Sequence, residues 1–464
     1  MADDATLLQR SKSEGTGMRF VHLLVAGSVG LSLLVATGLS NGPRQIAVGE
    51  PVSARSDAFT IGVSVHFGIG GEYGYDAGKS AAAIRDLGLT SYRDDLGWRP
   101  FLDPAEGRPG QRPRKLYGFM QQKAARPLLV IGHPNPSVPG GDPPISPAAQ
   151  DSFALFAGNA AVAMKPFDPM YEIWNEWNMN AVRGKPWLVG PGDPSDPRAA
   201  VHYTELAKKA SSAIAKASPR STILVGAVGI DNGWAWTKAM VGMGGLENAS
   251  GLSVHMYNHC EADKSKRTAT EMIDRLGELQ TFLRTRNGGA DYPVYVTEFG
   301  WPTVEAQCII TPDAAAANIA QFLLWGSATP WLKGAWIYEL KNSRQDTKDL
   351  ESGFGIYDYN YGPKPAACMT KESVQLIRSA KSTQLYRPTA DVFLLQLTQQ
   401  TGTTVVAWAT PGSHAVMSLS ADKKPSKAHM LCGAAVSGET IDIGSVPVVI
   451  SDADIGDIAL RTSR

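Results

Sequence analysis

Eight short apolar runs alternate with longer helix-like segments between Phe59 and about Ala380, and this alternation constrains the fold more than any other feature. The expected strands are Thr60–Phe67, Leu89–Asp94, Pro127–Ile131, Met170–Trp174, Thr222–Gly226, Leu252–His255, Val294–Thr297 and Gly334–Tyr338. Strands separated by helices pair in parallel through crossover connections. Eight such units predict an α/β fold, a (β/α)8 TIM barrel over residues 59–385. A doubly wound open sheet is the main alternative, although no G-x-G-x-x-G motif follows the first strand to indicate dinucleotide binding.

The pattern changes after Pro388, where short strands such as Asp391–Leu397 and Thr403–Ala409 follow one another with no helical segment between them. This change predicts a C-terminal, all-β, sandwich-like module over residues 386–464. Residues 41–58 show neither pattern, and we expect them to form a linker that leads into the barrel.

The first 40 residues differ in composition from the rest of the chain. Val21–Leu39 contains no Asp, Glu, Lys or Arg, and Arg10, Lys12 and Arg19 precede it. Residues 1–40 are therefore expected to be either a signal-anchor transmembrane helix or a cleaved signal peptide. Both alternatives export the chain, so we predict a periplasmic or cell-surface protein, anchored in the inner membrane by residues 21–39 if the segment is not cleaved.

Charge and cysteine content exclude some classes of protein. Lys plus Arg and Asp plus Glu both number 44, and this balance argues against a nucleic-acid partner. The four cysteines form no C-x-x-C pair and no zinc-ligand spacing with histidine. In an exported chain they permit two disulfides, and free buried thiols are the alternative. The positions of the predicted strands favour Cys260–Cys308 at the barrel mouth and Cys368–Cys432 between the two domains.

Two glutamates follow predicted strands at the positions where a barrel carries its catalytic groups. The fourth strand runs into Asn175-Glu176, and the seventh into Glu298-Phe299-Gly300. Strands four and seven lie on opposing parts of the rim, so the two carboxylates can face one another. Facing carboxylates are what cleavage of a glycosidic bond requires: one protonates the leaving oxygen and one meets the sugar carbon. Glu172 lies within the fourth strand and is expected to point away from the mouth.

The two motifs Asn175-Glu176 and Thr297-Glu298-Phe299-Gly300 resemble the signature of clan A glycoside hydrolases. Within the clan, the chain is most similar to glycoside hydrolase family 39 and to bacterial glycosidases encoded in exopolysaccharide operons. The stretch Trp336-Ile337-Tyr338-Glu339-Leu340 resembles the eighth-strand region of those proteins. The resemblance implies a retaining mechanism, with Glu176 as acid/base and Glu298 as nucleophile.

The same resemblance implies roles for residues at other strand ends. Arg93 corresponds to an arginine kept close to the nucleophile, and His255 and Tyr257 to a pair that supports the nucleophile and the sugar. Trp336 corresponds to the aromatic floor beneath the cleaved sugar. Asn175 is placed to bond the sugar's 2-hydroxyl, and His133 to bond another hydroxyl.

Tryptophans add a prediction about the shape of the site. Aromatic rings pack against the apolar face of a sugar. Seven of the 11 tryptophans are expected on the mouth side of the barrel: Trp98, Trp177, Trp187, Trp234, Trp236, Trp301 and Trp336. Because they follow several different strands, they predict a groove with sugar subsites on both sides of the two glutamates. Trp177 directly follows Glu176, the expected acid/base, and we expect it to bind substrate.

These observations together predict an exported retaining glycoside hydrolase that cleaves a bacterial exopolysaccharide internally. The alternatives are a transglycosylase, or a weakly catalytic carbohydrate-binding protein of polysaccharide assembly. No metal or organic cofactor is expected, because two carboxylates and water suffice. The expected partners are a polysaccharide or oligosaccharide substrate, the membrane if the N-terminal segment is uncleaved, and the exopolysaccharide synthesis machinery.

Overall fold

The computed structural model describes residues 44–69, 73–99, 111–179, 200–303, 308, 310–346, 348–420 and 428–462. The predicted signal segment, residues 1–40, lies outside these ranges. Among the described residues, no helix combines the length and the apolar character needed to cross a membrane.

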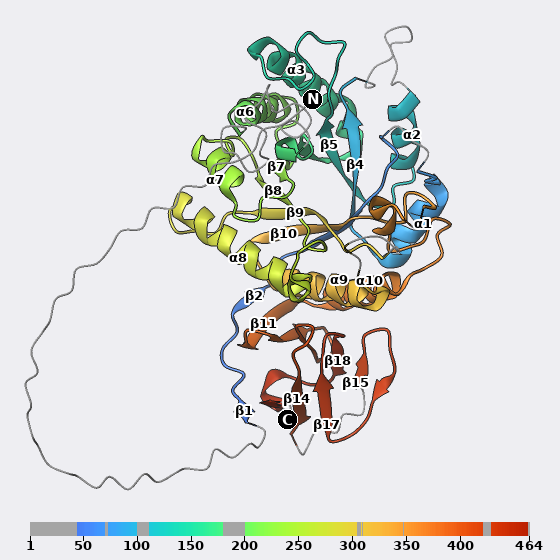
Figure 1. Ribbon diagram of the computed structural model, residues 1–464, viewed down its shortest axis with the longest axis vertical. Coiled ribbons are helices and arrows are strands. Elements are labelled where there is room, and N and C mark those ends of the chain that lie inside the picture. Colours follow the sequence, from blue (N-terminus) through green and yellow to red (C-terminus); the bar gives the residue numbers. More distant parts are fainter. Residues whose placement is uncertain are drawn as a thin grey trace, which may run out of the picture. The chain divides into compact units, whose positions relative to one another are not determined.

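Eight parallel strands close into a barrel, as the sequence predicts, and helices surround it (Figure 1). The barrel strands are β3 (Thr60–Ser64), β4 (Ser91–Gly97), β5 (Arg126–Gly132), β6 (Met170–Ile173), β7 (Ile223–Val228), β8 (Gly251–Met256), β9 (Val294–Phe299) and β10 (Leu332–Ile337). Each pairs with the next in chain order, and β10 closes the barrel against β3. The doubly wound alternative is therefore wrong.

Helices follow the barrel strands and cover the outside of the barrel. They are α1 (Ala77–Leu87), α2 (Gln111–Met120), α3 (Pro147–Met164), α6 (Ala200–Ala217), α7 (Ala235–Gly242), α8 (Ala269–Arg286), α9 (Pro312–Ser327) and α10 (Pro365–Ser379). Their N-termini carry the expected capping chemistry. Ser146 accepts a hydrogen bond from the Ala149 N–H before α3, and Thr311 accepts one from the Ala314 N–H before α9. Proline occupies the first helical position in both cases, where its missing N–H has no intrahelical partner to lose.

The C-terminal region is a β-sandwich, as predicted. Its strands are β11 (Ser382–Thr389), β12 (Val392–Thr398), β13 (Thr403–Ala409), β14 (Ala415–Leu419), β15 (Ala428–Met430), β16 (Ala435–Val436), β17 (Thr440–Ile443), β18 (Val448–Ser451) and β19 (Ile458–Thr462). They form two sheets in the orders β16-β15-β18-β13-β12-β11-β2 and β1-β19-β14-β17. Residues from both sheets, among them Leu394, Val405, Met417 and Leu460, form a separate apolar core.

The prediction of a linker over residues 41–58 needs correction, because this segment supplies two strands of the sandwich. β1 (Gln45–Ile46) pairs with β19, and β2 (Ser53–Arg55) pairs with β11. Arg55 also donates hydrogen bonds to the carbonyl oxygens of Gly326 and Pro330, at the barrel. The sandwich module is therefore discontinuous in sequence. Strands of two and three residues are too short to show an alternating pattern, so no pattern of apolar residues predicts them.

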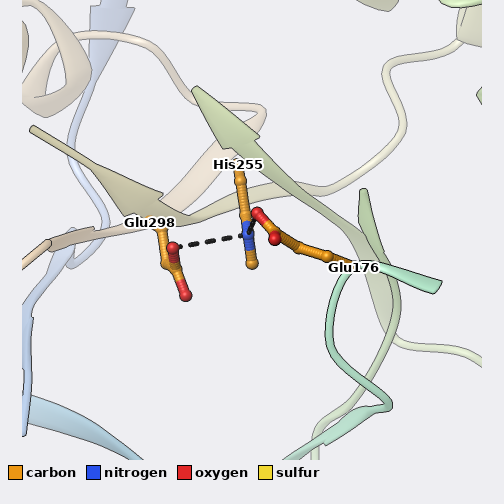
Figure 2. A group of neighbouring side chains, drawn as sticks. All are labelled: Glu176, His255 and Glu298. Carbon is orange, nitrogen blue, oxygen red and sulfur yellow. Dashed lines mark hydrogen bonds and ion pairs between the residues drawn. The ribbon is translucent and has the colours of Figure 1, made fainter. Parts of the chain in front are cut away.

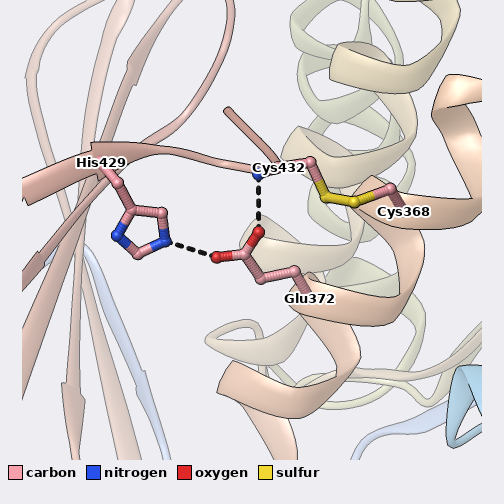
Figure 3. Close-up of a disulfide and its surroundings, with 4 residues drawn as sticks. All are labelled: Cys368, Glu372, His429 and Cys432. Carbon is pink, nitrogen blue, oxygen red and sulfur yellow. Dashed lines mark hydrogen bonds and ion pairs between the residues drawn. A yellow bond between two sulfur atoms is a disulfide. The ribbon is translucent and has the colours of Figure 1, made fainter. Parts of the chain in front are cut away.

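Both predicted disulfides are present, and no described cysteine is free. Cys368 on α10 is bonded to Cys432 in the sandwich (Figure 3). Beside this bridge, Glu372 accepts a hydrogen bond from the Cys432 N–H at 2.6 Å, and its other oxygen lies 2.6 Å from His429 Nε2. The bridge and these two contacts of Glu372 join the sandwich to the barrel, and the described residues from Arg44 to Thr462 belong to one compact unit.

Candidate active site

Arg93 lies at the centre of the barrel mouth and is buried. Its Nε donates to Glu172 Oε2 at 2.7 Å, its Nη1 to Glu298 Oε1 at 2.5 Å, and its Nη2 to Asn175 Oδ1 at 2.7 Å. Desolvation would lower the pKa of Arg93, but the carboxylates of Glu172 and Glu298 outweigh it and raise the pKa above its usual value. One guanidinium thus connects β4, β6 and β9. Arg93 therefore lies beside Glu298, the residue expected to be the nucleophile.

Glu176 and Glu298 face one another with His255 between them (Figure 2). His255 Nδ1 lies 2.9 Å from Glu176 Oε1 and 3.5 Å from Glu298 Oε2. The ring nitrogen and one oxygen of each glutamate all lie within 4.8 Å of one another. Burial would lower the pKa of His255, but Glu298 and Glu176 outweigh it and raise the pKa. The two glutamates predicted from separate strands are therefore neighbours.

The chain around β6 and β9 explains how the two carboxylates come together. Glu298 is the fifth residue of β9 and pairs in register with His255 on β8. Glu176 follows the end of β6, where Trp174 and Glu176 both have positive φ angles, 66° and 45°. These left-handed residues turn the chain at the mouth, and the Glu176 N–H donates to the carbonyl of Ala227 on β7. Glu176 is thereby fixed to the neighbouring strand.

Glu298 has a hydrogen-bond donor on each of its oxygens. Arg93 bonds Oε1, and the Tyr257 hydroxyl donates to Oε2 at 2.7 Å. Desolvation and the nearby charge of Glu298 raise the pKa of Tyr257 well above its usual value, so the phenol remains a donor. The two donors fix the orientation of the carboxylate on a rigid strand. His255 and Tyr257 thus both contact Glu298, and their expected support of the sugar stays a prediction.

A pocket of about 550 Å³ opens above the two glutamates. Asn175 lines it beside Glu176, as predicted. Its aromatic lining comes from Tyr257, His259, Tyr338 and Phe354, and no described lysine or arginine lines it. The Tyr257 and Tyr338 rings both contact Phe354 edge to face, with centroids 5.6 and 5.4 Å apart. Such a mixture of aromatic rings and a few polar groups is typical of a pocket for a small ligand.

The prediction that Trp336 forms the floor of this pocket is wrong. Trp336 is fully buried inside the barrel, where it packs with Leu128, Met170 and Leu224. Its indole N–H donates to Ser91 Oγ at 3.0 Å. Side chains of a strand face the barrel interior at every second residue, so the next such position towards the mouth is Tyr338. Tyr338, unlike Trp336, lines the pocket.

Trp177 is not placed to contact a ligand in this pocket either. It is fully buried, its ring lies against Trp174 and Tyr203, and it does not line the pocket. The same holds for four other tryptophans, which are at most 7% exposed: Trp98, Trp234, Trp236 and Trp301. Trp187 lies outside the described residues. The predicted groove of tryptophans is therefore wrong for the described residues, because these rings pack between the strands and helices instead.

His133 lies at the end of β5 with its side chain partly exposed. Its Nε2 is 2.6 Å from Asp95 Oδ1. Burial would raise the pKa of Asp95, but His133 and Arg93 outweigh it and lower the pKa. The structure does not place His133 in the lining of the 550 Å³ pocket. Its expected bond to a sugar hydroxyl stays a prediction.

Glu172 is the residue whose importance the sequence analysis missed. It points into the barrel beneath the mouth, is fully buried, and lies against Arg93. The neighbouring Tyr171 and Ile173 are apolar and buried, so a charge between them needs an internal partner. A glutamate flanked by core residues within a predicted strand was a usable signal for this ion pair.

Removing Glu172 is expected to lower the stability of the protein. Glu172→Ala leaves part of the Arg93 charge uncompensated in the core, so the free energy of unfolding should fall by about 3–5 kcal/mol. Glu172→Gln keeps an acceptor for Arg93 and should cost less. Urea denaturation of the two variants measures the difference. An unchanged midpoint for Glu172→Ala would mean that the pair contributes nothing to the fold.

Glu351 is another carboxylate that lines the pocket with Glu176 and Glu298. Desolvation, and then repulsion from Glu298 and Glu176, raise its pKa to about 7. The repulsion is reciprocal, so ionised Glu351 favours the protonated form of Glu176. Glu351→Gln should therefore move the alkaline limb of the kcat/KM profile to lower pH, since the acid then loses its proton more readily. A limb that stayed in place would exclude this coupling.

Glu176, His255 and Glu298 are the one group of at least three possible ligands found close enough for a metal ion in the described part of the chain. Arg93 disfavours a cation there, because its guanidinium already bonds Glu298 and lies 3.4 Å from His255 Nε2. The expectation of a reaction without metal or cofactor stays a prediction, and activity unchanged by a chelator would support it.

Comparisons with known proteins bear on the fold. No protein-family model matches the chain, and no curated protein matches it. Among solved structures, a family 39 glycoside hydrolase from Bacteroides cellulosilyticus WH2 matches with a TM-score of 0.65 and 20% identity, over 85% of this chain and 80% of that one. The chain has the fold of family 39 glycoside hydrolases. The match extends over most of both chains.

Two further structures agree. A family 39 enzyme from Xanthomonas axonopodis pv. citri matches with a TM-score of 0.54 and 11% identity, over 90% of this chain and 96% of that one. A family 5 glycoside hydrolase from Streptomyces cattleya, in complex with GlcNAc, matches with a TM-score of 0.52 and 17% identity, over 70% of this chain and 82% of that one. At these identities the likeness concerns the fold, and function has to be argued from the site.

Proposed function

We propose that the protein is a retaining glycoside hydrolase. The observation that carries the proposal is the pair of glutamates at one end of the barrel, with single oxygens of Glu176 and Glu298 within 4.8 Å of each other at the base of a pocket. Retaining enzymes keep their two carboxyl groups about 5–5.5 Å apart, whereas inverting enzymes need about 6.5–9.5 Å to admit a water. The short separation favours direct attack by a glutamate.

The surroundings of the two glutamates divide the roles between them. Glu298 is buried, is held by Arg93 and Tyr257, and acts as the nucleophile that forms a glycosyl ester. Glu176 is more exposed and protonates the leaving oxygen, after which it deprotonates the water that hydrolyses the ester. Asn175, bonded to Arg93 and lining the pocket, bonds the 2-hydroxyl of the sugar.

The test is a panel of 4-nitrophenyl β-glycosides of xylose, glucose, mannose and N-acetylglucosamine. The sugars follow the names of similar structures, which include a β-xylosidase, a glucosidase and a complex with Manb1-4GlcNAc. For a substrate that is turned over, proton NMR shows which anomer forms first. Release of the β-anomer supports retention. Release of the α-anomer first would contradict the assignment of Glu298 as nucleophile.

For the natural substrate we propose an exopolysaccharide of the producing cell, cleaved internally outside the cytoplasm. The apolar segment Val21–Leu39 supports export, and an uncleaved segment would keep the enzyme at the membrane beside the synthesis machinery. Incubating the protein with that polymer and following product size tests the idea. A rapid fall in polymer length supports internal cleavage, and release of monosaccharide with slow shortening contradicts it. Longer products with added acceptor sugars would identify a transglycosylase instead.

A further inference from the structure

A second pocket of about 250 Å³ lies at the mouth, at the end of β3. Its lining includes His66, Phe67, Tyr73, Tyr75, Lys115 and Tyr359, and none of the described residues that line it also lines the active-site pocket. No carboxylate is among its described lining residues. Neither the catalytic pair nor the residues that hold it use this pocket.

Tyr73, Tyr75 and Tyr359 form the aromatic part of the pocket lining. The buried Lys341 contacts the rings of two of them, Tyr75 and Tyr359. Lys341 Nζ lies 4.7 Å from the centroid of the Tyr75 ring and 4.2 Å from that of Tyr359. The same ammonium group donates to the carbonyl oxygens of Tyr73 and Asn342, at 2.7 and 2.9 Å. The aromatic walls are thus set before any ligand arrives, and preset aromatic faces suit the apolar face of a sugar ring.

His66 separates this pocket from the active site. Its ring lies 5.3 Å from Tyr73 in the second pocket and 5.7 Å from Tyr338 in the first, measured between centroids. Its Nε2 is 3.0 Å from Glu339 Oε2, and its buried Nδ1 has no hydrogen-bond partner among the described residues. The rings of His66 and Tyr338 therefore lie between the two pockets. The Nδ1 atom of His66 is free to bond a ligand, as far as the described residues are concerned.

The roles of the glutamates decide which part of a substrate would reach the second pocket. Glu176 protonates the leaving oxygen, so the leaving group lies on its side of the mouth, near Met179 and Ile230. The sugar attacked by Glu298 extends away from there, towards Tyr338 after β10. β10 pairs with β3, at whose end the second pocket lies. A sugar attached to the non-reducing side of the attacked unit is thus directed to the second pocket.

We propose that the second pocket binds a pyranose unit on the non-reducing side of the cleaved sugar, stacked on Tyr359 and Tyr73. This inference rests on the proposed function, because the direction of the substrate follows from the roles of Glu176 and Glu298. It makes the enzyme prefer chains over single sugars, and Tyr359 and Tyr73 are specificity-determining residues.

The test compares a 4-nitrophenyl monoglycoside with the 4-nitrophenyl bioside that carries one more sugar on its non-reducing side. Both share the leaving group, so their difference reports on the second pocket alone. We expect a kcat/KM about tenfold higher for the bioside, which corresponds to one good sugar–aromatic contact. Tyr359→Ala and Tyr73→Ala should remove this preference and leave the monoglycoside rate unchanged. Tyr359→Phe keeps the ring and should retain it. Tyr292→Ala, before β9 at the other end of the barrel, is the matched control.

Binding to Glu298→Gln separates the two proposals. Titration calorimetry with the bioside and the monoglycoside needs no turnover, and the tighter binding of the bioside should be lost with Tyr359→Ala in the same background. Equal binding of the two ligands, with wild-type turnover intact, would overturn the second pocket as a sugar subsite. A preserved binding difference without any turnover by the wild-type protein would support the subsite and contradict the proposed hydrolysis.

Discussion

Glu298→Gln is expected to lower kcat/KM by about 10⁴-fold or more, because the amide cannot form the glycosyl ester. The substitution keeps the shape of the side chain: the amide oxygen can accept from Arg93, and the amide NH2 can donate to the Tyr257 oxygen, so the fold should survive. Steady-state rates on the best aryl glycoside and a thermal melt measure the two properties separately.

Glu261→Gln is the matched control for this variant. Glu261 also lines the pocket, but neither His255 nor Arg93 contacts it, and its removal should leave the chemical step intact. A Glu298→Gln protein that retained most of the wild-type rate, after contaminating enzyme had been excluded, would contradict the assignment of the nucleophile.

Glu176→Ala should slow aryl glycosides according to their leaving group. For poor leaving groups the loss of the acid should cost about 10²–10⁴-fold. For 2,4-dinitrophenol, which needs little protonation, formation of the glycosyl ester should stay fast and its hydrolysis should become rate-limiting. Added azide needs no general base, so it should restore part of the turnover and yield a glycosyl azide.

The identity of that azide product is itself informative. A retaining enzyme attacked at the ester should give the azide with the configuration of the substrate. Failure of azide to rescue Glu176→Ala, with equal losses for good and poor leaving groups, would mean that Glu176 is not the acid/base.

The sequence analysis located the barrel and the two glutamates correctly because both follow from strong local patterns. Eight apolar runs alternate with helical segments, and each glutamate directly follows such a run. A parallel barrel brings all strand ends to one face, so residues far apart in sequence become neighbours once the strands are identified. Arg93, His255 and Tyr257 were identified through the resemblance to a known family, and all three contact Glu298 in the structure.

The aromatic residues were predicted less well, for a physical reason. Side chains of a barrel strand point inward at every second residue, and the last inward side chain lies at the mouth. An error of one or two residues in the predicted strand end therefore assigns the wrong residue to the mouth. Trp336 is therefore buried one layer below Tyr338. Trp177 has a large apolar side chain, and its burial against Trp174 and Tyr203 lowers the free energy of the folded state more than exposure at the surface would. The second pocket could not be predicted, because Tyr73, Lys341 and Tyr359 come together only in the folded chain.

The central claim, that Glu298 attacks the sugar, is tested most directly by trapping the covalent intermediate. A 2-deoxy-2-fluoro glycoside with a good leaving group forms the glycosyl ester but hydrolyses slowly, because fluorine disfavours the oxocarbenium-like transition state. Mass spectrometry of the inactivated protein should show one added sugar, and peptide sequencing should place it on Glu298. A label on Glu176, or hydrolysis with inversion and no adduct at any time, would contradict the account.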